Sequence, residues 1–276
     1  MFPTPIQKSS ASVSLLYKIS LPICLIIWLV PLLAVAITSV RSAGDITAGN
    51  YWGWPESFNL IENYQAVFEN TPIGQYIWNS FKVTIPTVIG AVGLSCLTGF
   101  ALAVYRFKSN IFVLFLFIAG NFIPFQILMV PVRDMTVQTG MYDTATGLIL
   151  FHIAFQTGFC TFFMRNFIST LPFSLIEAPR IDGCGEFKIF LLIVMPLMKP
   201  AVAALAVLIF TFIWNDYFWA TVLVQGNHIM PVTSGLKSLN GQWLAAWHLV
   251  SAGSILAALP PVKHFIAGLT LGANKG

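Results

Sequence analysis

The chain alternates long apolar segments with short polar ones, and this alternation predicts its architecture. A helix needs about 20 consecutive apolar residues to cross a bilayer. Segments near that length lie at about residues 20–40, 83–105, 111–132, 144–164, 198–224 and 244–267. The pattern therefore predicts an all-α membrane protein with six transmembrane helices. It divides the chain into an N-terminal segment (residues 1–19), a six-helix domain (residues 20–267) and a tail (residues 268–276).

The first apolar segment has a second interpretation. Lys8 and Lys18 precede it and Ala34-Val35-Ala36 follows, as in a signal peptide with its cleavage site. The apolar run is longer than the roughly 7–15 residues of a signal-peptide core. We therefore expect an uncleaved anchor.

Composition narrows the class of protein. Hydrophobic residues make up 57% of the 276 residues and charged residues only 9%, whereas soluble domains carry about 25% charged residues. The mean hydropathy is +0.80. These values exclude a soluble enzyme, and the net charge of +4 is too small to indicate a nucleic-acid partner. None of the 4 cysteines forms a Cys-x-x-Cys pair, which favours isolated apolar cysteines over a metal site.

The few charged residues are distributed unevenly between the two sides of the predicted spans. Most of the 14 basic residues fall on one side: Lys8, Lys18, Arg106, Lys108, Arg165, Arg180, Lys188, Lys199, Lys263 and Lys275. The positive-inside rule makes this side cytoplasmic, so both termini are predicted to be cytoplasmic. The opposite side carries most of the acidic residues, and its residues 59–68 predict a short helix capped by Asn59, with Leu60, Tyr64, Val67 and Phe68 as its apolar stripe.

The cytoplasmic loop of residues 169–197 predicts an amphipathic helix. Apolar Leu175 and Ile181 recur near helical spacing, and Gly183 suits the left-handed conformation that ends helices. A second short helix is expected to follow and to stop at Met195-Pro196. From the residues alone, the apolar face of the first helix fits a membrane surface and a groove in another protein equally well.

Several strings in the chain carry a family resemblance. Glu177-Ala178-Pro179-Arg180-Ile181-Asp182-Gly183, followed by Ile193-Val194-Met195-Pro196-Leu197, resembles the EAA loop of ABC importer permeases. The string Trp214-Asn215-Asp216-Tyr217-Phe218-Trp219 and the C-terminal residues 268–276 resemble the carbohydrate-uptake branch of that family. Together they cover nearly the whole chain and imply the fold of an ABC type I importer permease.

The resemblance implies a set of partners. In that family a second homologous permease pairs with the first, two ATPase subunits dock beneath them, and an extracytoplasmic binding protein delivers the sugar or oligosaccharide. The expected location is a bacterial or archaeal cytoplasmic membrane, in contact with lipid. ATP and magnesium are expected in the partner ATPase, and no cofactor or metal in this chain. The chain has no Gly-Lys dipeptide, so it cannot carry a Walker-type phosphate loop.

The resemblance also assigns roles to residues of the cytoplasmic loop. It places the ATPase contact at Leu175, Ile176, Glu177, Ala178, Pro179, Arg180, Ile181, Asp182 and Gly183. Glu177 is the acidic residue expected to meet the ATPase, Arg180 and Asp182 would add polar contacts, and the aliphatic residues would supply apolar area. The family usually has alanine where this chain has Pro179. Because proline lacks an N–H, we predict a kink or an early end of the helix there.

Polar and aromatic residues inside the predicted spans are candidates for the translocation path, because polar groups are costly in lipid. The candidates are Asn121, Gln126, Gln156, Trp214, Asn215, Asp216 and Tyr217. Hydrogen bonding between helices is the alternative role, above all for Asp216. In the loop of residues 226–243, the resemblance implies a flexible segment that faces the binding protein, at Pro231, Gly235, Lys237 and Gly241. A plain connector is the alternative there.

Two other classes of protein fit less well. A stand-alone secondary transporter or channel usually has internal repeats and coupling-ion sites, and the sequence shows no clear repeat. An integral-membrane enzyme would need a clustered nucleophile, base or metal set. The scattered histidines and the single carboxylate within a span do not provide one, so no enzyme activity is expected in this chain.

Overall fold

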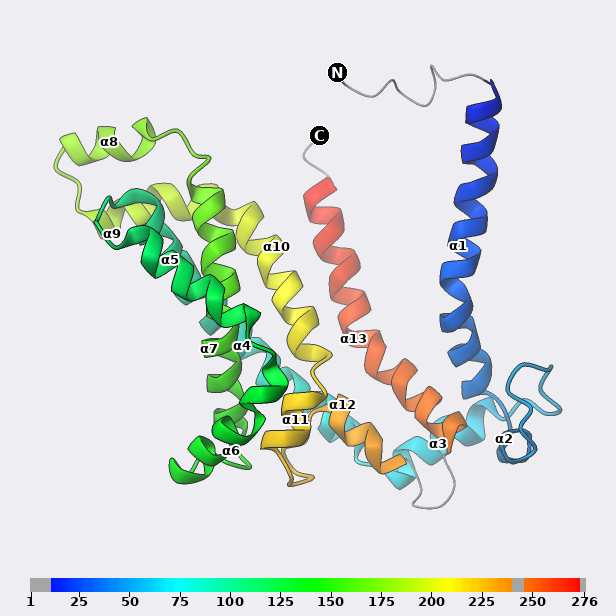
Figure 1. Cartoon of the computed structure of the whole chain (residues 1–276). Helices are drawn as coiled ribbons and strands as arrows, with labels where there is room; N and C mark the ends of the chain where they lie inside the picture. The colour runs from blue at the N-terminus through cyan, green and yellow to red at the C-terminus, as the bar shows by residue number, and fades with distance from the viewer. Residues whose placement is uncertain (1–10, 240–245, 274–276) are drawn as a thin grey trace. The chain divides into compact units, whose positions relative to one another are not determined.

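The computed structural model of the chain describes residues 11–239 and 246–273. Within these ranges the secondary structure is helical, and extended pairing is limited to one antiparallel bridge between Arg41 and Phe58. The chain divides into two compact units, residues 1–71 with 238–256 and residues 72–237 with 257–276. Figure 1 shows the helices of both units. The predicted all-α class is confirmed.

The first unit is dominated by α1 (Ala11–Ser39), an apolar helix that is exposed on all sides within the chain. Its large side chains, such as Trp28 (71% exposed), are exposed. A helix that is apolar around its whole circumference requires a surrounding of lipid or of other helices. The unit also contains α2 (Ala43–Thr47), α3 (Leu60–Asn70) and the start of α13 (Trp247–Ala273).

The short helix α3 begins where the sequence predicts, but its contacts differ. Asn59 is the N-cap residue, yet its side chain makes no capping hydrogen bond. Val67 is buried, whereas Leu60 and Phe68 are exposed, so the predicted apolar stripe facing the membrane surface stays a prediction at these two positions. Asn63 is also buried, and its amide donates a 2.9 Å hydrogen bond to the backbone oxygen of Ser39. This long-range hydrogen bond attaches α3 to the end of α1.

The second unit is built around α4 (Ile73–Val104) and α7 (Ala145–Ile168), which pack against each other. The other elements follow in chain order: α5 (Asn110–Ala119), η2 (Gly120–Phe122), η3 (Phe125–Leu128), α6 (Met129–Gln138), α8 (Ser174–Ile181), α9 (Glu186–Ile189), η4 (Phe190–Val194), α10 (Met195–Trp214), α11 (Phe218–Leu223), α12 (Val232–Gly235), the first half of η5 (Leu236–Leu239) and the rest of α13. In Figure 1, α8 lies at one end of α7 and α10, whereas α6 and α11 lie at the other end. We call these the α8 end and the α6 end.

Small residues hold α4 and α7 close together. A Cβ atom added to Gly99 would lie 2.9 Å from the Cβ of Met164, so a larger residue does not fit there. The hydroxyls of Thr98 and Thr161 lie 2.7 Å apart across the same interface. Small residues with interhelical hydrogen bonds are the usual means by which helices associate in a membrane.

Four helical stretches of the described residues are long and apolar enough to cross a membrane: Ser12–Ser39, Ile73–Val104, Ala145–Ile168 and Glu186–Trp214. The third predicted span is a bent pair, Asn110–Phe122 and Phe125–Gln138, with a bend of 88°. Pro124 explains the break, because a residue that precedes proline is disfavoured in the helical conformation. Ile123 accordingly has an extended backbone with ψ 122°.

The fifth span differs from its prediction at both ends. α9, the π-helical turn η4 and α10 form one run from Glu186 to Trp214, so the predicted stop at Met195-Pro196 is wrong. The wider π turn precedes Pro196 and makes room for its ring, which would otherwise crowd the carbonyl four residues back. At the other end the helix stops at Trp214 rather than near residue 224, and a separate short helix restarts at Phe218.

The sixth predicted span, residues 244–267, overlaps α13, which begins at Trp247. The helix runs through Pro260 and Pro261, as the prediction requires. The side chains from residue 262 onward lie outside the described residues. The crossing of the membrane by this helix therefore stays a prediction.

Candidate functional site

The helix predicted in the loop of residues 169–197 is α8, and its residues divide into a buried and an exposed set. Ile176 is 3% exposed and belongs to the core cluster that also contains Ile189 and Phe190. Leu175 and Ile181 are 40% and 85% exposed. The expectation that all three aliphatic residues supply docking area is therefore wrong for Ile176, which attaches α8 to its own unit.

The C-terminal end of α8 is built around Gly183. The helix continues through Pro179 to Ile181, so the early end at the proline is wrong, and the kink predicted as its alternative stays a prediction. Beyond it, the N–H of Cys184 donates to the backbone oxygen of Pro179 at 2.9 Å, and the N–H of Gly183 donates to that of Arg180 at 3.2 Å. These bonds, with Gly183 at φ +81°, form a Schellman end. The predicted left-handed glycine is confirmed.

Arg180 is engaged within the chain. Its Nε donates to Oε1 of Glu186 at 2.7 Å, and its Nη2 donates to Oε2 at 3.0 Å. The Tyr105 hydroxyl donates to the same Oε2 at 2.8 Å. The hydrogen bond to Glu186 raises the pKa of Arg180, and burial, followed by the bond to Glu186, raises the pKa of Tyr105. Because Tyr105 directly follows α4, this cluster ties α8 and α9 to the end of α4.

The other polar residues of the segment face outward. Glu177, Ala178, Asp182 and Gly183 are exposed, while Pro179 is half-buried. No salt bridge involves Glu177 or Asp182 in the described part of the chain. The α8 end therefore exposes two carboxylates beside the side chains of Leu175 and Ile181. The buried side of α8, with Ile176, packs against the rest of the unit.

The predicted path residues do not gather at one site. Trp214 is 2% exposed, and its indole Nε1 donates to the backbone oxygen of Ala257 at 3.1 Å. Asn215 is exposed, but its amide donates to the backbone oxygen of Thr211, one turn back. Tyr217 is 47% exposed. Trp214 is thus a packing residue in this unit, and of these three only Tyr217 offers an exposed ring.

The three remaining amide candidates also lie apart. Asn121 borders an apolar pocket between α5 and α7, and its amide donates to the backbone oxygen of Phe117 at 3.0 Å. Gln126 is exposed in η3, and Gln156 is half-buried in α7. These three residues stay candidates for the translocation path, and within the described part of the chain the structure shows no cavity that they share.

Asp216 has a structural environment. Its two carboxylate oxygens accept hydrogen bonds from the backbone N–H groups of Trp219 (3.2 Å) and Ala220 (2.9 Å) in the first turn of α11. His152 Nε2, from the buried face of α7, lies 3.3 Å from Oδ2. The hydroxyl of Thr233 donates to the backbone oxygen of Asp216. Asp216 therefore fixes α11 to the end of α10 and to α7, which supports the structural alternative for this residue.

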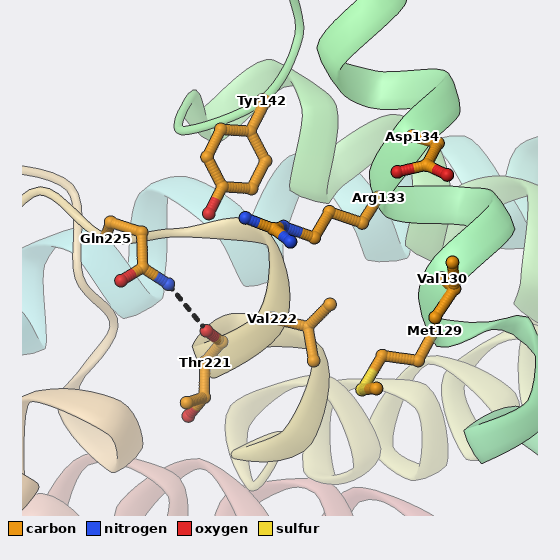
Figure 2. A pocket seen from close by; sticks show the side chains of 8 residues that line it. All are labelled: Met129, Val130, Arg133, Asp134, Tyr142, Thr221, Val222 and Gln225. Atoms are coloured by element: carbon orange, nitrogen blue, oxygen red, sulfur yellow. Dashed lines mark hydrogen bonds between the residues drawn. The ribbon is translucent and has the colours of Figure 1, made fainter.

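A pocket lined by both polar and apolar side chains lies between α6 and α11 at the α6 end (Figure 2). We call it the α6–α11 pocket. Its volume is about 350 Å³, and its lining residues are Met129, Val130, Arg133, Asp134, Tyr142, Thr221, Val222 and Gln225. In Figure 2 the Arg133 side chain extends to the Tyr142 ring, with Cζ 5.4 Å from the ring centroid. Within the described residues neither Arg133 nor Asp134 forms a salt bridge.

Asp143 fixes the wall of this pocket. Its Oδ1 accepts hydrogen bonds from the backbone N–H groups of Gln225 (2.7 Å) and Gly226 (2.8 Å), and its own N–H donates to the backbone oxygen of Leu223 at 2.9 Å. Asp143 has φ +56°, a left-handed conformation that non-glycine residues rarely adopt. The sequence gives no signal for this pocket, since its residues come from segments about 80 positions apart.

The predicted flexible loop is partly wrong. Pro231 is buried just before α12, and Gly235 lies so close to α4 that an added Cβ would be 2.3 Å from the ring of Tyr76. The backbone N–H of Val232 donates to the hydroxyl of Ser80 at 2.8 Å. These residues are packed on α4 and cannot serve as a flexible probe. Lys237 is exposed, and Gly241 lies outside the described residues.

The sequence matches a known family. Residues 91–262 match the family described as binding-protein-dependent transport system inner membrane component. The arabinooligosaccharides transport system permease protein AraQ of Halalkalibacterium halodurans is 33% identical over 98% of this chain and 99% of its own length. The melibiose/raffinose/stachyose import permease protein MelC of Bacillus subtilis is 33% identical over 90% of this chain and 91% of its own length.

A solved structure supports the fold. The chain resembles a chain of a bacterial ABC transporter involved in the import of the acidic polysaccharide alginate, with a TM-score of 0.79 at 21% identity, over 97% of this chain and 99% of that one. The helix α8 and the packed pair of α4 and α7 are consistent with the fold of the family that the sequence matches. The chain therefore belongs to the inner membrane components of binding-protein-dependent transport systems and is a permease subunit of an ABC importer.

Proposed function

We propose that this permease imports sugars or oligosaccharides in an ATP-driven complex with a second homologous permease and two ATPase subunits. A binding protein outside the membrane delivers the substrate, and ATP and magnesium are bound by the ATPase subunits. The names of relatives such as AraQ and MelC, which describe transport of arabinooligosaccharides and of melibiose, raffinose and stachyose, support this substrate class. The α8 end lies in the cytoplasm together with both termini, because the basic residues gather on that side.

The observation that carries the coupling role is the division of α8 into an attached and an exposed face. Ile176 and the Arg180–Glu186 pair hold the helix to the unit, while Glu177 and Ile181 face outward. A short helix with an apolar and acidic exposed face suits a groove in another protein. The ATPase contact therefore consists of Leu175, Glu177, Ile181 and Asp182, and Arg180 holds the helix in position.

The mechanism follows from this arrangement. ATP binding closes the ATPase subunits and moves the two docked α8 helices toward each other. Because α8 is tied to α4 and α9, the unit moves with it as a rigid body. The two permeases then alternate between states open to the inside and to the outside.

The α6–α11 pocket is the place in this chain where substrate contact has the best support. It combines a guanidinium, a carboxylate and an amide with one aromatic ring, and sugar hydroxyls need both donors and acceptors. Its walls come from α6 and α11, which follow the break of the third span at Pro124 and the end of α10 at Trp214. In transporters, interrupted helices commonly line the substrate site.

Substitution of Glu177 tests the proposed function. The variant Glu177→Lys should lose ATP-driven uptake and release the ATPase during purification, while the two permeases stay paired in the membrane. Glu62→Lys, an acidic residue of α3, serves as the matched control and should retain uptake. Normal uptake by Glu177→Lys would remove this residue from the coupling role, and uptake without ATP would overturn the importer assignment.

A further inference from the structure

The segment between α1 and α3 folds into a closed loop at the end of α1. We call residues 41–58 the aromatic loop. Its first and last residues, Arg41 and Phe58, form an antiparallel bridge, and the N–H of Asn59 donates to the backbone oxygen of Val40 at 2.8 Å. The base of the loop is therefore fixed two residues beyond Ser39, where α1 ends.

The interior of the aromatic loop is polar. Arg41 is 1% exposed, and its Nη2 donates to the backbone oxygens of Tyr51, at 3.2 Å, and of Gly53. Asp45 is also buried, and its carboxylate accepts hydrogen bonds from the Asn50 amide at 2.9 Å and from the backbone N–H of Glu56 at 3.3 Å. Burial works to raise the pKa of Asp45, but these hydrogen bonds outweigh it and lower the pKa. The tip of the loop is thus attached to the residue next to the helix end.

The exterior of the aromatic loop carries four exposed aromatic side chains. Trp52 is 83% exposed and Trp54 is 78% exposed, while Tyr51 and Phe58 are also exposed. The rings of Trp54 and Phe58 pack edge to face, with centroids 5.9 Å apart. Arg41 and Asp45 are thus buried while two indoles face outward, which is the opposite of the distribution in a loop that faces water. Its outer surface needs a partner with an apolar side and a polar side.

The level of this surface relative to the membrane follows from α1. Lys18 is the last charged residue before the apolar stretch, and residues 19–38 contain none. Twenty helical residues rise about 30 Å, which equals the thickness of the hydrocarbon core. Ser39 therefore lies at the boundary between hydrocarbon and headgroups, and Arg41 holds the loop tip near that boundary.

We propose that the aromatic loop is a membrane-interface anchor, in which Trp52 and Trp54 insert among the phospholipid headgroups at the Ser39 end of α1. Tryptophan concentrates at this depth because its ring is apolar while its N–H requires a polar partner. The loop fixes how deeply α1 lies in the membrane and how it is rotated about its own axis, because the rest of α1 is uniformly apolar. The continuity of the loop with the end of α1 favours lipid over a docked protein or a sugar as the occupant.

Paramagnetic broadening in nanodiscs tests the location. The full chain is labelled with 5-fluorotryptophan and reconstituted in phosphatidylcholine and phosphatidylglycerol, and Trp52→Phe and Trp54→Phe assign the two fluorine signals. Both signals should lose most intensity with a nitroxide on the lipid headgroup and less with a nitroxide at the acyl-chain end or a soluble gadolinium chelate. Trp28, in the middle of α1, provides the depth reference.

Each other outcome overturns the proposal. Broadening by gadolinium without loss from the headgroup nitroxide would place the loop in water, as a surface for a protein or a sugar. Protection from all three probes would place it against another subunit. A second readout tests the anchoring role itself: the Trp52→Asp/Trp54→Asp double variant should shift the depth profile of Trp28, whereas Trp52→Tyr/Trp54→Tyr should not, because tyrosine also prefers the interface. An unchanged Trp28 profile in the Asp variant would overturn the anchoring role.

Discussion

The contact between Arg180 and Glu186 should determine how tightly uptake is coupled to ATP hydrolysis. The pair makes two charge-assisted hydrogen bonds, of 2.7 and 3.0 Å, between side chains that are 37% and 39% exposed. Exposed ion pairs contribute about 0.2–1 kcal/mol, and bidentate geometry places this one near the upper end. Loss of about 1 kcal/mol would raise the population in which α8 is detached from α9 about fivefold.

Two measurements follow from this estimate. In Arg180→Ala, the backbone amides of α8 should exchange hydrogen about fivefold faster, and the ratio of substrate imported to ATP hydrolysed should fall while the ATPase still binds. Tyr105→Phe is the matched control, because it removes one hydrogen bond from the cluster and leaves the charge pair intact. The Arg180→Glu/Glu186→Arg double variant should recover part of the coupling.

A double-mutant cycle tests whether Arg180 and Glu186 act together. If Arg180→Ala and Glu186→Ala have additive effects on exchange and on coupling, the two side chains do not act together. The same conclusion would follow if the amides of α8 exchanged at the unaltered rate in Arg180→Ala. Arg180 would then return to the set of exposed residues that contact the ATPase.

Other predictions concern packing, capping and turn geometry. Gly235→Ala should destabilise the permease by about 1–3 kcal/mol in thermal unfolding, because the added methyl group overlaps the buried ring of Tyr76. Gly93→Ala is the control. It should be neutral or stabilising, because no atom lies within 4 Å of the added carbon. Asp216→Ala should cost about 1 kcal/mol by uncapping α11, measured as a lower midpoint of thermal unfolding, and a midpoint equal to that of the unaltered protein would count against the cap. Gly183→Ala should cost about 1 kcal/mol because φ is +81° there, and it should lower coupling more than Gly185→Ala, whose φ is −69°.

The sequence locates the apolar helices because each apolar stretch is a local signal, but it misplaces helix ends, as in the fifth span. It also predicts the Schellman glycine at Gly183, since the conformational preference of glycine acts on a single residue. The end of the fifth span at Trp214 escapes prediction. The apolar character continues to residue 224, and what interrupts the helix is the capping of α11 by Asp216 with His152 nearby.

The contents of the candidate sites are harder to predict, because they depend on contacts between distant segments. Gly235 suggests flexibility in the sequence, yet it serves to bring the loop against Tyr76, 159 positions earlier. The engagement of Arg180 cannot be read from the seven-residue motif of residues 177–183, because its partner Glu186 lies beyond the Gly183 turn. The α6–α11 pocket depends on Asp143, whose contacts with Gln225 and Gly226 have no local signature.

The uninterrupted run from Glu186 to Trp214 gives the permease a lever arm. Its 29 residues extend about 43 Å, which is enough to cross the whole bilayer. The Arg180–Glu186 pair attaches to its first residue, and Asp216, which caps α11 beside the α6–α11 pocket, follows its last by two. A tilt of about 10° around one end would move the other by about 7 Å. A rotation of this run imposed through α8 would therefore move the helix end beside the α6–α11 pocket by several ångströms.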